Sequence, residues 1–205
     1  MKKFVSYVKR SIAVTLLILP NLLSAAKVDA PAPDFVLLNT QGEQVKLSDY
    51  RGQYVVLEWT NHLCPYVQKH YSGGNMQGLQ NKYTEQDVVW LSIISSAPGK
   101  QGHIDGDKAD SLTTERGAAP TAVLFDPEGT TGKQYNAKTT PHMYVIDPQG
   151  MLRYAGAIDS IKSANPADIA KATNYLDQSM MQLLAGQPVS EKMTVPYGCT
   201  IKYKG

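Results

Sequence analysis

The feature that most limits how this chain can fold is a Cys-Pro pair that closely follows a buried strand. Residues 54–59 form a β-rich and mostly apolar run suited to the centre of a sheet. Cys64 and Pro65 come next, and residues 65–84 can form two helical segments. A second apolar run follows at residues 88–94. The order strand, helix, strand predicts a parallel pair joined by a right-handed crossover, and therefore an α/β fold.

The rest of the chain adds strands, one longer helix and a tail. We expect strands at residues 121–125, 143–146 and 152–155, a hairpin between the last two, and an amphipathic helix at residues 168–184. Residues 27–185 then form a single domain with a mixed central sheet flanked by helices. Residues 186–205 are expected to be an irregular C-terminal tail that carries Cys199.

The N-terminus has the order of charges and apolar residues that is typical of an export signal. Basic side chains at residues 2–10 precede an apolar run at residues 12–23 and then Ser24-Ala25-Ala26. The alternative is an uncleaved anchor, but the run is shorter than the ~20 apolar residues that a membrane span needs. We therefore predict a signal peptide at residues 1–26, a periplasmic or secreted location, and no stable membrane association after cleavage.

The charge balance argues against two classes of partner. The chain has 20 basic and 18 acidic side chains, and cleavage after residue 26 removes four of the basic ones, leaving 16 against 18. A slightly acidic protein without a basic run is not expected to bind nucleic acid or an anionic membrane. We also expect no cofactor and no metal, because His62 and Cys64 lack the further ligands that a recognisable metal site requires.

Cys64 has the position of a reactive cysteine. Pro65 fits the first position of a helix, and the backbone N–H groups there favour a thiolate over a thiol. The alternative is a structural cysteine. The chain has one other cysteine, Cys199, and an even pair in an oxidising compartment forms either a redox couple or a permanent disulfide. Composition leaves both possibilities open.

Four segments carry a resemblance to a known superfamily. They are residues 47–52 (Leu-Ser-Asp-Tyr-Arg-Gly), 58–67 (Glu-Trp-Thr-Asn-His-Leu-Cys-Pro-Tyr-Val), 139–148 (Thr-Thr-Pro-His-Met-Tyr-Val-Ile-Asp-Pro) and 196–203 (Pro-Tyr-Gly-Cys-Thr-Ile-Lys-Tyr). Together they resemble the redoxin superfamily, and within it the peroxiredoxin-like branch of the alkyl hydroperoxide reductase and thiol-specific antioxidant family. The resemblance implies a thioredoxin-like fold and a thiol oxidoreductase or peroxidase activity.

The match to peroxiredoxins is incomplete around the cysteine. Those proteins place a proline seven residues and a threonine or serine three residues before it, where this chain has Leu57 and Asn61. Their arginine at the start of a later strand is also missing, because that strand begins here at Pro141. By charge alone, Arg116 and Arg153 are candidate replacements, and the alternative for each is an ordinary surface salt bridge.

The thioredoxin comparison adds supporting residues. The second cysteine of a C-x-x-C motif is here Val67, whereas Thr140-Pro141 fits the cis-proline beside a thioredoxin active site, where a substrate backbone can pair. The residues expected to support Cys64 or to bind substrate are Thr60, Asn61, His62, Pro65, Thr140 and Pro141.

Three functions remain open from the sequence. The first is a peroxidase in which Cys64 reduces a small hydroperoxide, Cys199 forms a disulfide with it, and an external thiol restores both. The second is thiol-disulfide exchange with a protein disulfide as substrate. The third is a redox-inert domain that is stapled by a permanent Cys64–Cys199 bridge.

Overall fold

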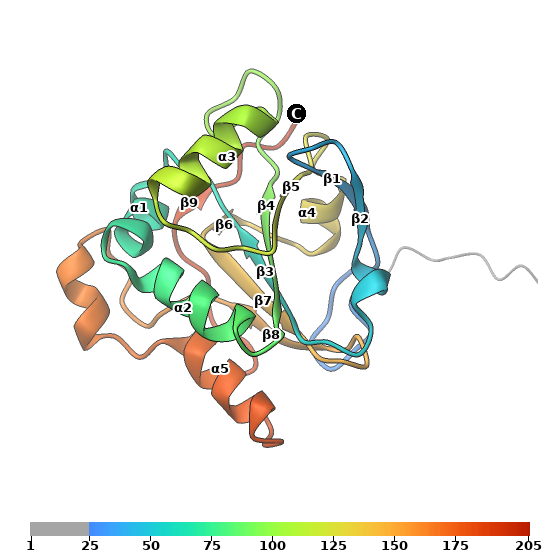
Figure 1. Ribbon diagram of the computed structural model, residues 1–205. Coiled ribbons are helices and arrows are strands. Elements are labelled where there is room, and N and C mark those ends of the chain that lie inside the picture. Colours follow the sequence, from blue (N-terminus) through green and yellow to red (C-terminus); the bar gives the residue numbers. More distant parts are fainter. Residues whose placement is uncertain (1–24) are drawn as a thin grey trace, which may run out of the picture.

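The computed structural model describes residues 25–205, and its centre is a mixed sheet of seven strands (Figure 1). The strands are β1 (Val36–Asn39), β2 (Gln44–Lys46), β3 (Val55–Trp59), β4 (Val89–Ile94), β5 (Ala122–Phe125), β7 (His142–Ile146) and β8 (Leu152–Gly156), in the spatial order β2-β1-β5-β4-β3-β7-β8. The strand pairs β3–β4 and β4–β5 are parallel, and the other neighbours are antiparallel. A separate short pair joins β6 (Thr139–Thr140) to β9 (Cys199–Thr200).

The helices lie on the two faces of this sheet. They are α1 (Pro65–Ser72), α2 (Asn75–Thr84), α3 (Gly106–Glu115), α4 (Thr130–Gln134) and α5 (Tyr175–Leu184), with short 3-10 helices η1 (Leu47–Tyr50) and η2 (Pro166–Lys171). Side chains from α1, α2 and α5 pack on one face, whereas Tyr135 and Ala137, which follow α4, pack on the other. Figure 1 shows α1, α2, α3 and α5 together on one side of the strands.

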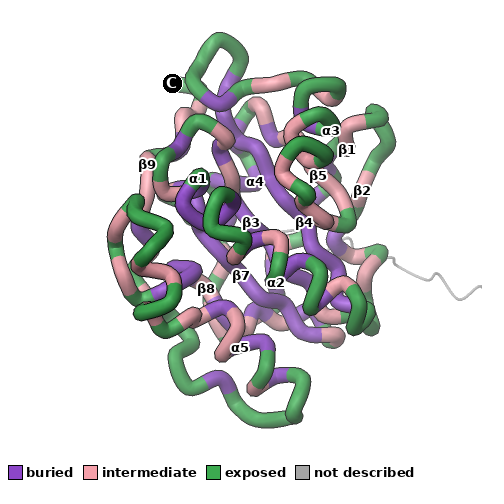
Figure 2. The backbone as a smooth tube through the Cα atoms, turned by 60° about the vertical axis from the view of Figure 1, so that its left-hand side comes forward, coloured by how far each residue is buried: buried purple, intermediate pink, exposed green. Residues whose placement is uncertain are grey.

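The central strands separate two apolar cores, because successive side chains on a strand point to opposite faces. In β3, Val55, Leu57 and Trp59 belong to one core and Val56 to the other. Every residue of β3, β4 and β7 is buried, and Figure 2 shows these strands running through the middle of the molecule. This double burial explains why their sequences are nearly continuous apolar runs.

The main expectations for the fold are confirmed. The predicted strands at residues 54–59 and 88–94 form β3 and β4, which pair in parallel from Val55 opposite Val89 to Trp59 opposite Ile93. The helical segments after Cys64 form α1 and α2. The thioredoxin-like arrangement of a mixed sheet flanked by helices is present, and the Thr140-Pro141 peptide bond is cis.

Two expectations were wrong. The helix predicted at residues 168–184 is divided: η2 ends at Lys171, and α5 begins at Tyr175, because the Asn174 side chain accepts a hydrogen bond from the Asp177 backbone N–H (3.0 Å) and caps a new helix. The tail is also not irregular throughout. It contributes β9 to a strand pair and buries the side chains of Val189, Tyr197 and Ile201.

The predicted signal peptide lies almost wholly outside the described residues, which begin at residue 25. From there to Gly205, none of the helices has the length and apolar character that crossing a membrane requires.

Candidate active site

Cys64 is held at the N-terminal end of α1 by the loop that precedes it. The Asn61 side chain accepts a hydrogen bond from the Leu63 backbone N–H (2.9 Å), and the Asn61 carbonyl accepts one from the Cys64 N–H (3.0 Å). Cys64 has an extended backbone and is the N-cap, and Pro65 starts the helix. Asn61 therefore shapes the loop that aims Cys64. Its amide nitrogen is directed to the Gln101 carbonyl (3.4 Å).

The cis-proline loop lies directly against the cysteine. The Cys64 Sγ donates a hydrogen bond to the backbone carbonyl of Thr140 (3.1 Å), and Cys64 is fully buried. This contact confirms the expectation that the Cys64 and Thr140-Pro141 loops meet at one end of the sheet.

The tail brings the second cysteine to the same place. In the antiparallel pair β6–β9, Cys199 lies opposite Thr140, the residue whose carbonyl accepts from Cys64. Both cysteines are free thiols, and each is close enough to shift the acidity of the other. The structure thus places together two cysteines that are far apart in the sequence.

Gly198 allows the tail to approach this closely. A Cβ atom at this position would lie 2.0 Å from the Thr140 carbonyl oxygen, and its φ of 138° is one that side-chain-bearing residues rarely adopt. Only glycine fits without displacing the tail. This role was not predicted from the sequence, although a glycine next to Cys199 was the available signal.

The two thiols have opposite acidities. Burial opposes ionisation of Cys64, but the Cys199 thiol and the Val67 backbone N–H stabilise its thiolate by more than burial destabilises it, so the pKa of Cys64 is lowered from its usual value. Burial, together with the hydrogen bond to Cys64 and the charge of its thiolate, raises the pKa of Cys199 to about 12. Cys64 is therefore the better nucleophile of the pair at neutral pH.

Thr140 offers the thiolate a further donor, its side-chain hydroxyl. Among residues 25–205, its Oγ1 has no hydrogen-bond partner while Cys64 is a neutral thiol. The hydroxyl is therefore available to the thiolate, and it is one of the groups that lower the pKa of Cys64.

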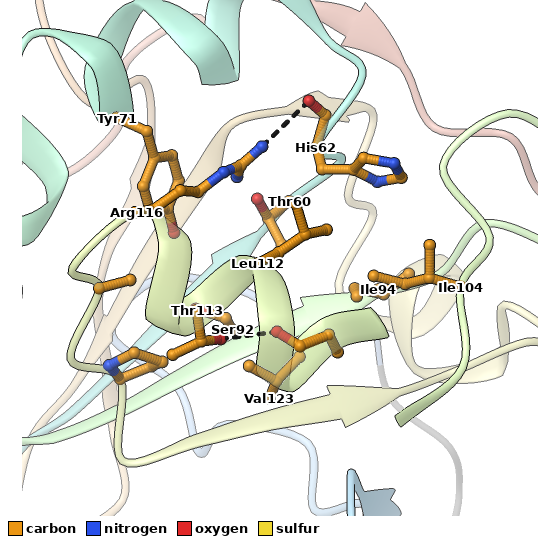
Figure 3. Close-up of a pocket in the computed structure, with 13 residues that line it drawn as sticks. Thr60, His62, Tyr71, Ser92, Ile94, Ile104, Leu112, Thr113, Arg116 and Val123 are labelled. Carbon is orange, nitrogen blue, oxygen red and sulfur yellow. Dashed lines mark hydrogen bonds between the residues drawn. The ribbon is translucent and has the colours of Figure 1, made fainter. Parts of the chain in front are cut away.

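Thr60 and His62 line a cavity whose lining does not include Cys64. This cavity of about 40 Å³ lies under α3, beside Arg116, which donates to the His62 carbonyl (3.2 Å; Figure 3). Burial, and then the charges of Arg116 and Lys108, lower the pKa of the His62 imidazole. The cavity has room for roughly one or two waters, and Cys64 does not line it.

Neither candidate arginine is bonded to Cys64. Arg116 reaches the His62 carbonyl, with its guanidinium 4.7 Å from the centre of the Tyr71 ring. Arg153 on β8 is paired with Asp147 (2.6 Å) and Asp29 (3.1 Å). The support for the Cys64 thiolate described above comes from neutral hydrogen-bond donors.

A buried carboxylate on β3 accepts hydrogen bonds from both helices that follow Cys64. Glu58 is fully buried and accepts hydrogen bonds from Tyr71 Oη (2.9 Å), Trp90 Nε1 (2.9 Å), Ser92 Oγ (3.0 Å) and Gln80 Nε2 (3.3 Å). We call this group the Glu58 cluster. Because its donors come from α1, α2 and β4, it joins the elements that surround the site.

The described part of the chain contains no group of three or more His, Cys, Asp and Glu side chains placed to hold a metal.

Comparison with known proteins places the chain among thiol redox proteins. The model of the AhpC/TSA family matches residues 28–155. The chain is 27% identical over 130 residues to the thiol-disulfide oxidoreductase ResA of Geobacillus kaustophilus strain HTA426, covering 63% of this chain and 69% of that protein. It is 28% identical over 163 residues to the mitochondrial thioredoxin-dependent peroxide reductase of Drosophila melanogaster, covering 71% of this chain and 64% of that protein.

A solved structure is similar along most of the chain. The crystal structure of an uncharacterized conserved protein from Geobacillus kaustophilus superposes with a TM-score of 0.75 and 27% identity, covering 90% of this chain and 94% of that one.

Proposed function

Because this chain belongs to the AhpC/TSA family and is a thiol oxidoreductase of thioredoxin-like fold, we propose that Cys64 reduces a small hydroperoxide and that Cys199 resolves the product as an internal disulfide. The observation that carries the proposal is the pairing of the two free thiols through β6 and β9. A difference in acidity between the two sulfurs serves no purpose in a permanent disulfide. It does serve a redox pair, in which one sulfur is the nucleophile and the other resolves the product.

The tail supports a small oxidant over a large one. Cys64 is fully buried, and the edge of Thr140 that would pair with an extended substrate is already paired with β9. A protein disulfide would have to displace the tail before it reached Cys64. A hydroperoxide needs only enough room for its two oxygens to approach the sulfur.

In the first step the Cys64 thiolate attacks the terminal oxygen of the hydroperoxide. The S–O bond forms as the O–O bond breaks, the sulfur is oxidised to a sulfenic acid, and the leaving oxygen takes up a proton to become an alcohol or water. The Val67 N–H and the Thr140 hydroxyl stabilise the attacking thiolate.

In the second step the Cys199 sulfur attacks the sulfenic acid. A disulfide forms, the hydroxyl of the sulfenic acid leaves with the Cys199 proton as water, and the pair has lost two electrons in total. The negative charge of the Cys64 thiolate, which helps to raise the pKa of Cys199, no longer exists at this stage. The resolving cysteine is thus made more acidic by the oxidation of its partner.

An external thiol then restores the pair. Its thiolate attacks the Cys199 sulfur, which is more exposed than that of Cys64, and Cys64 leaves as the thiolate of lower pKa. A second external thiol attacks the mixed disulfide and releases Cys199. Two external thiols become one disulfide, which balances the two electrons given to the hydroperoxide.

Mass spectrometry of three proteins tests the scheme. Treated with one equivalent of hydrogen peroxide and a sulfenic-acid trap, the protein should lose two mass units and form a Cys64–Cys199 disulfide. Cys199→Ser should instead accumulate the trapped adduct on Cys64, and Cys64→Ser should not react. If the pair stays reduced, or if the disulfide resists millimolar dithiol in the folded protein, the proposal fails.

Thiol-disulfide exchange is the second candidate, and the similarity to ResA together with the cis-proline loop favours it. Cys64 would attack a protein disulfide to form a mixed disulfide, and Cys199 would displace the substrate thiol. Competition between equal concentrations of hydrogen peroxide and a disulfide-bonded peptide distinguishes the two. We propose that either reaction takes place outside the cytoplasm, as the predicted signal peptide requires.

A further inference from the structure

The tail is bound to α1 by a tyrosine that lies two residues before Cys199. Tyr197 is only 5% exposed, and its ring packs edge-on against Tyr66 of α1, with 5.7 Å between the ring centres. Its hydroxyl donates a hydrogen bond to Asp159 and accepts one from Lys69 Nζ (3.2 Å). The tail is thus attached to the same helix that carries Cys64 at its N-terminus.

Lys69 is buried, and a lysine is almost never fully buried unless it is paired with an opposite charge. It is 1% exposed, and its ammonium donates to Asp159 Oδ2 (2.9 Å) and to the Ile161 carbonyl (3.0 Å) as well as to Tyr197. Asp159 also accepts from the Ile161 backbone N–H (3.1 Å). All three donor positions of the ammonium are used, and two segments distant in sequence supply the acceptors.

A buried ion pair contributes little net stability, because removing two charges from water offsets their attraction. Its clearer effect is on geometry, since each partner must be in place for the other to remain buried. Here the pair requires Tyr197, the loop that follows β8, and α1 to keep one arrangement.

We propose that Lys69, Asp159 and Tyr197, which we call the tail-binding cluster, are positioning residues that hold the Cys199 thiol against Cys64. The inference rests on the proposed function, since it concerns the step in which Cys199 resolves oxidised Cys64. None of the hydrogen bonds described above for the cluster reaches either sulfur. It acts by ordering the tail in the dithiol form, so that forming the disulfide requires little further ordering.

The consequence is a high effective concentration of Cys199 at Cys64. In a tail that is already ordered, the second sulfur meets the first as part of one rigid unit, and the equilibrium with external thiols favours the internal disulfide. In a loosened tail, disulfide formation must also order the segment around Cys199, and the equilibrium shifts toward the dithiol.

The test is the equilibrium of the Cys64–Cys199 pair with reduced and oxidised glutathione, read by mass spectrometry after acid quenching. Tyr197→Phe removes one hydroxyl but keeps the ring and the Lys69–Asp159 pair. We expect it to lower the equilibrium constant for the internal disulfide at least fivefold, and Asp159→Asn to lower it in the same direction. If Asp159→Asn does not fold, Tyr197→Phe decides the question.

Tyr203→Phe is the matched control. Tyr203 lies in the same tail, and its hydroxyl donates to the Ala137 carbonyl (2.8 Å), away from the cluster. It should change the equilibrium less than twofold, and sulfenic-acid formation on Cys64 should be equal in Cys199→Ser with and without Tyr197→Phe. A twofold or smaller effect of Tyr197→Phe, or an equal effect of Tyr203→Phe, overturns the positioning role alone. Absence of any internal disulfide in the parent overturns the proposed function and the positioning role with it.

Discussion

The Glu58 cluster and the tail-binding cluster both include side chains of α1, yet they satisfy buried charge in different ways. Among residues 25–205, Glu58 has no basic partner, and its carboxylate accepts from four neutral donors on α1, α2 and β4. Lys69 is paired with an acid and with groups from two distant segments. The Glu58 cluster joins α1, α2, β3 and β4 to one another, and we call these elements the frame. The tail-binding cluster joins the C-terminal tail to that frame.

Neutral hydrogen bonds and an ion pair differ in how they depend on the position of the tail. Four neutral donors around one carboxylate cannot rearrange without leaving several buried polar groups unpaired, which suits a permanent frame. An ion pair completed by a tyrosine from the tail depends on whether the tail is bound. We therefore expect the Glu58 cluster to control global stability and the tail-binding cluster to control the redox couple.

The largest expected effect is that of Glu58→Ala on stability. The change removes the shared acceptor and leaves the buried hydrogen-bonding groups of Tyr71, Trp90, Ser92 and Gln80 without it. At about 1–3 kcal/mol for each unsatisfied group, with partial rearrangement, the free energy of unfolding should fall by about 4 kcal/mol or more. Urea denaturation at pH 7 measures the loss.

Glu128→Ala is the control for that measurement, because Glu128 is exposed and forms only a surface ion pair with Lys204 (2.7 Å). It should cost less than about 1 kcal/mol. A similarly small loss for Glu58→Ala would show that the donors find other acceptors, and the contrast between the two clusters would disappear.

Gly198→Ala should mainly affect the redox pair. The added Cβ would meet the Thr140 carbonyl oxygen at 2.0 Å, so the tail must move away from the cis-proline loop. We expect internal disulfide formation to slow by about 100-fold or more, equivalent to about 2.7 kcal/mol, with attack of Cys64 on peroxide retained. Quenched-flow mass spectrometry separates the two steps.

Gly186→Ala separates the close contact from backbone strain. Gly186 also has a positive φ, of 69°, but a Cβ there would meet no atom within 4 Å. It should lower stability modestly and leave disulfide formation unchanged. Equal slowing in both variants would mean that strain alone, rather than the contact with Thr140, explains the effect.

The surroundings of Cys64 could be predicted from the sequence, whereas the position of the tail could not. The environment of Cys64 is local: an apolar strand, a proline in the first helical position and backbone N–H groups all lie within a few residues of it. Such patterns are readable because neighbouring residues determine them. The same reasoning predicted the cis-proline loop, through its resemblance to a known motif.

The position of Cys199 could not be read in this way. Strand β9 has two residues, too few for an alternating pattern, and Tyr197 is placed by Lys69 and Asp159, which are 128 and 38 residues away. In the sequence, Lys69 cannot be distinguished from an ordinary exposed basic residue in the last turn of a helix. Its burial follows from the docking of the tail and the loop after β8, which no local pattern records.

Acid should weaken the protein through His70, which adjoins the tail-binding cluster. Burial lowers the pKa of His70 to about 4, with Asp159 opposing the shift and Lys69 adding to it. The neutral ring accepts from Asn75 (2.9 Å) and lies 3.3 Å from the Tyr197 hydroxyl. Because the unfolded state binds a proton near pH 6.5 and the folded state does not, stability is complete above that pH and falls below it.

The expected loss from His70 is about 1.4 kcal/mol per pH unit below 6.5, or about 2 kcal/mol at pH 5. His142, whose pKa burial and then Lys138 lower to about 3, adds a similar slope. Urea denaturation from pH 7.5 to 4.5 should therefore show a shallower acid slope for His70→Gln and for His142→Gln. An unchanged slope in His70→Gln would mean that His70 becomes charged in the folded state without cost.

The smallest effect concerns the coupling between the two sulfurs, measured as alkylation rate against pH in the reduced protein. The rate at Cys64 should have its inflection below that of an ordinary thiol, whereas Cys199 should react slowly until well above it, because burial and the Cys64 thiolate raise its pKa to about 12. In Cys64→Ser the thiolate is gone but burial remains. The inflection of Cys199 should therefore move down, toward the value of a free thiol, without reaching it, and its rate at pH 8 should rise severalfold.

Tyr203→Phe, which leaves both sulfurs in place, should leave both profiles unchanged. If the Cys199 profile is the same in Cys64→Ser and the parent, the sulfurs do not interact in solution, and the tail is not held against Cys64 as the tail-binding cluster requires.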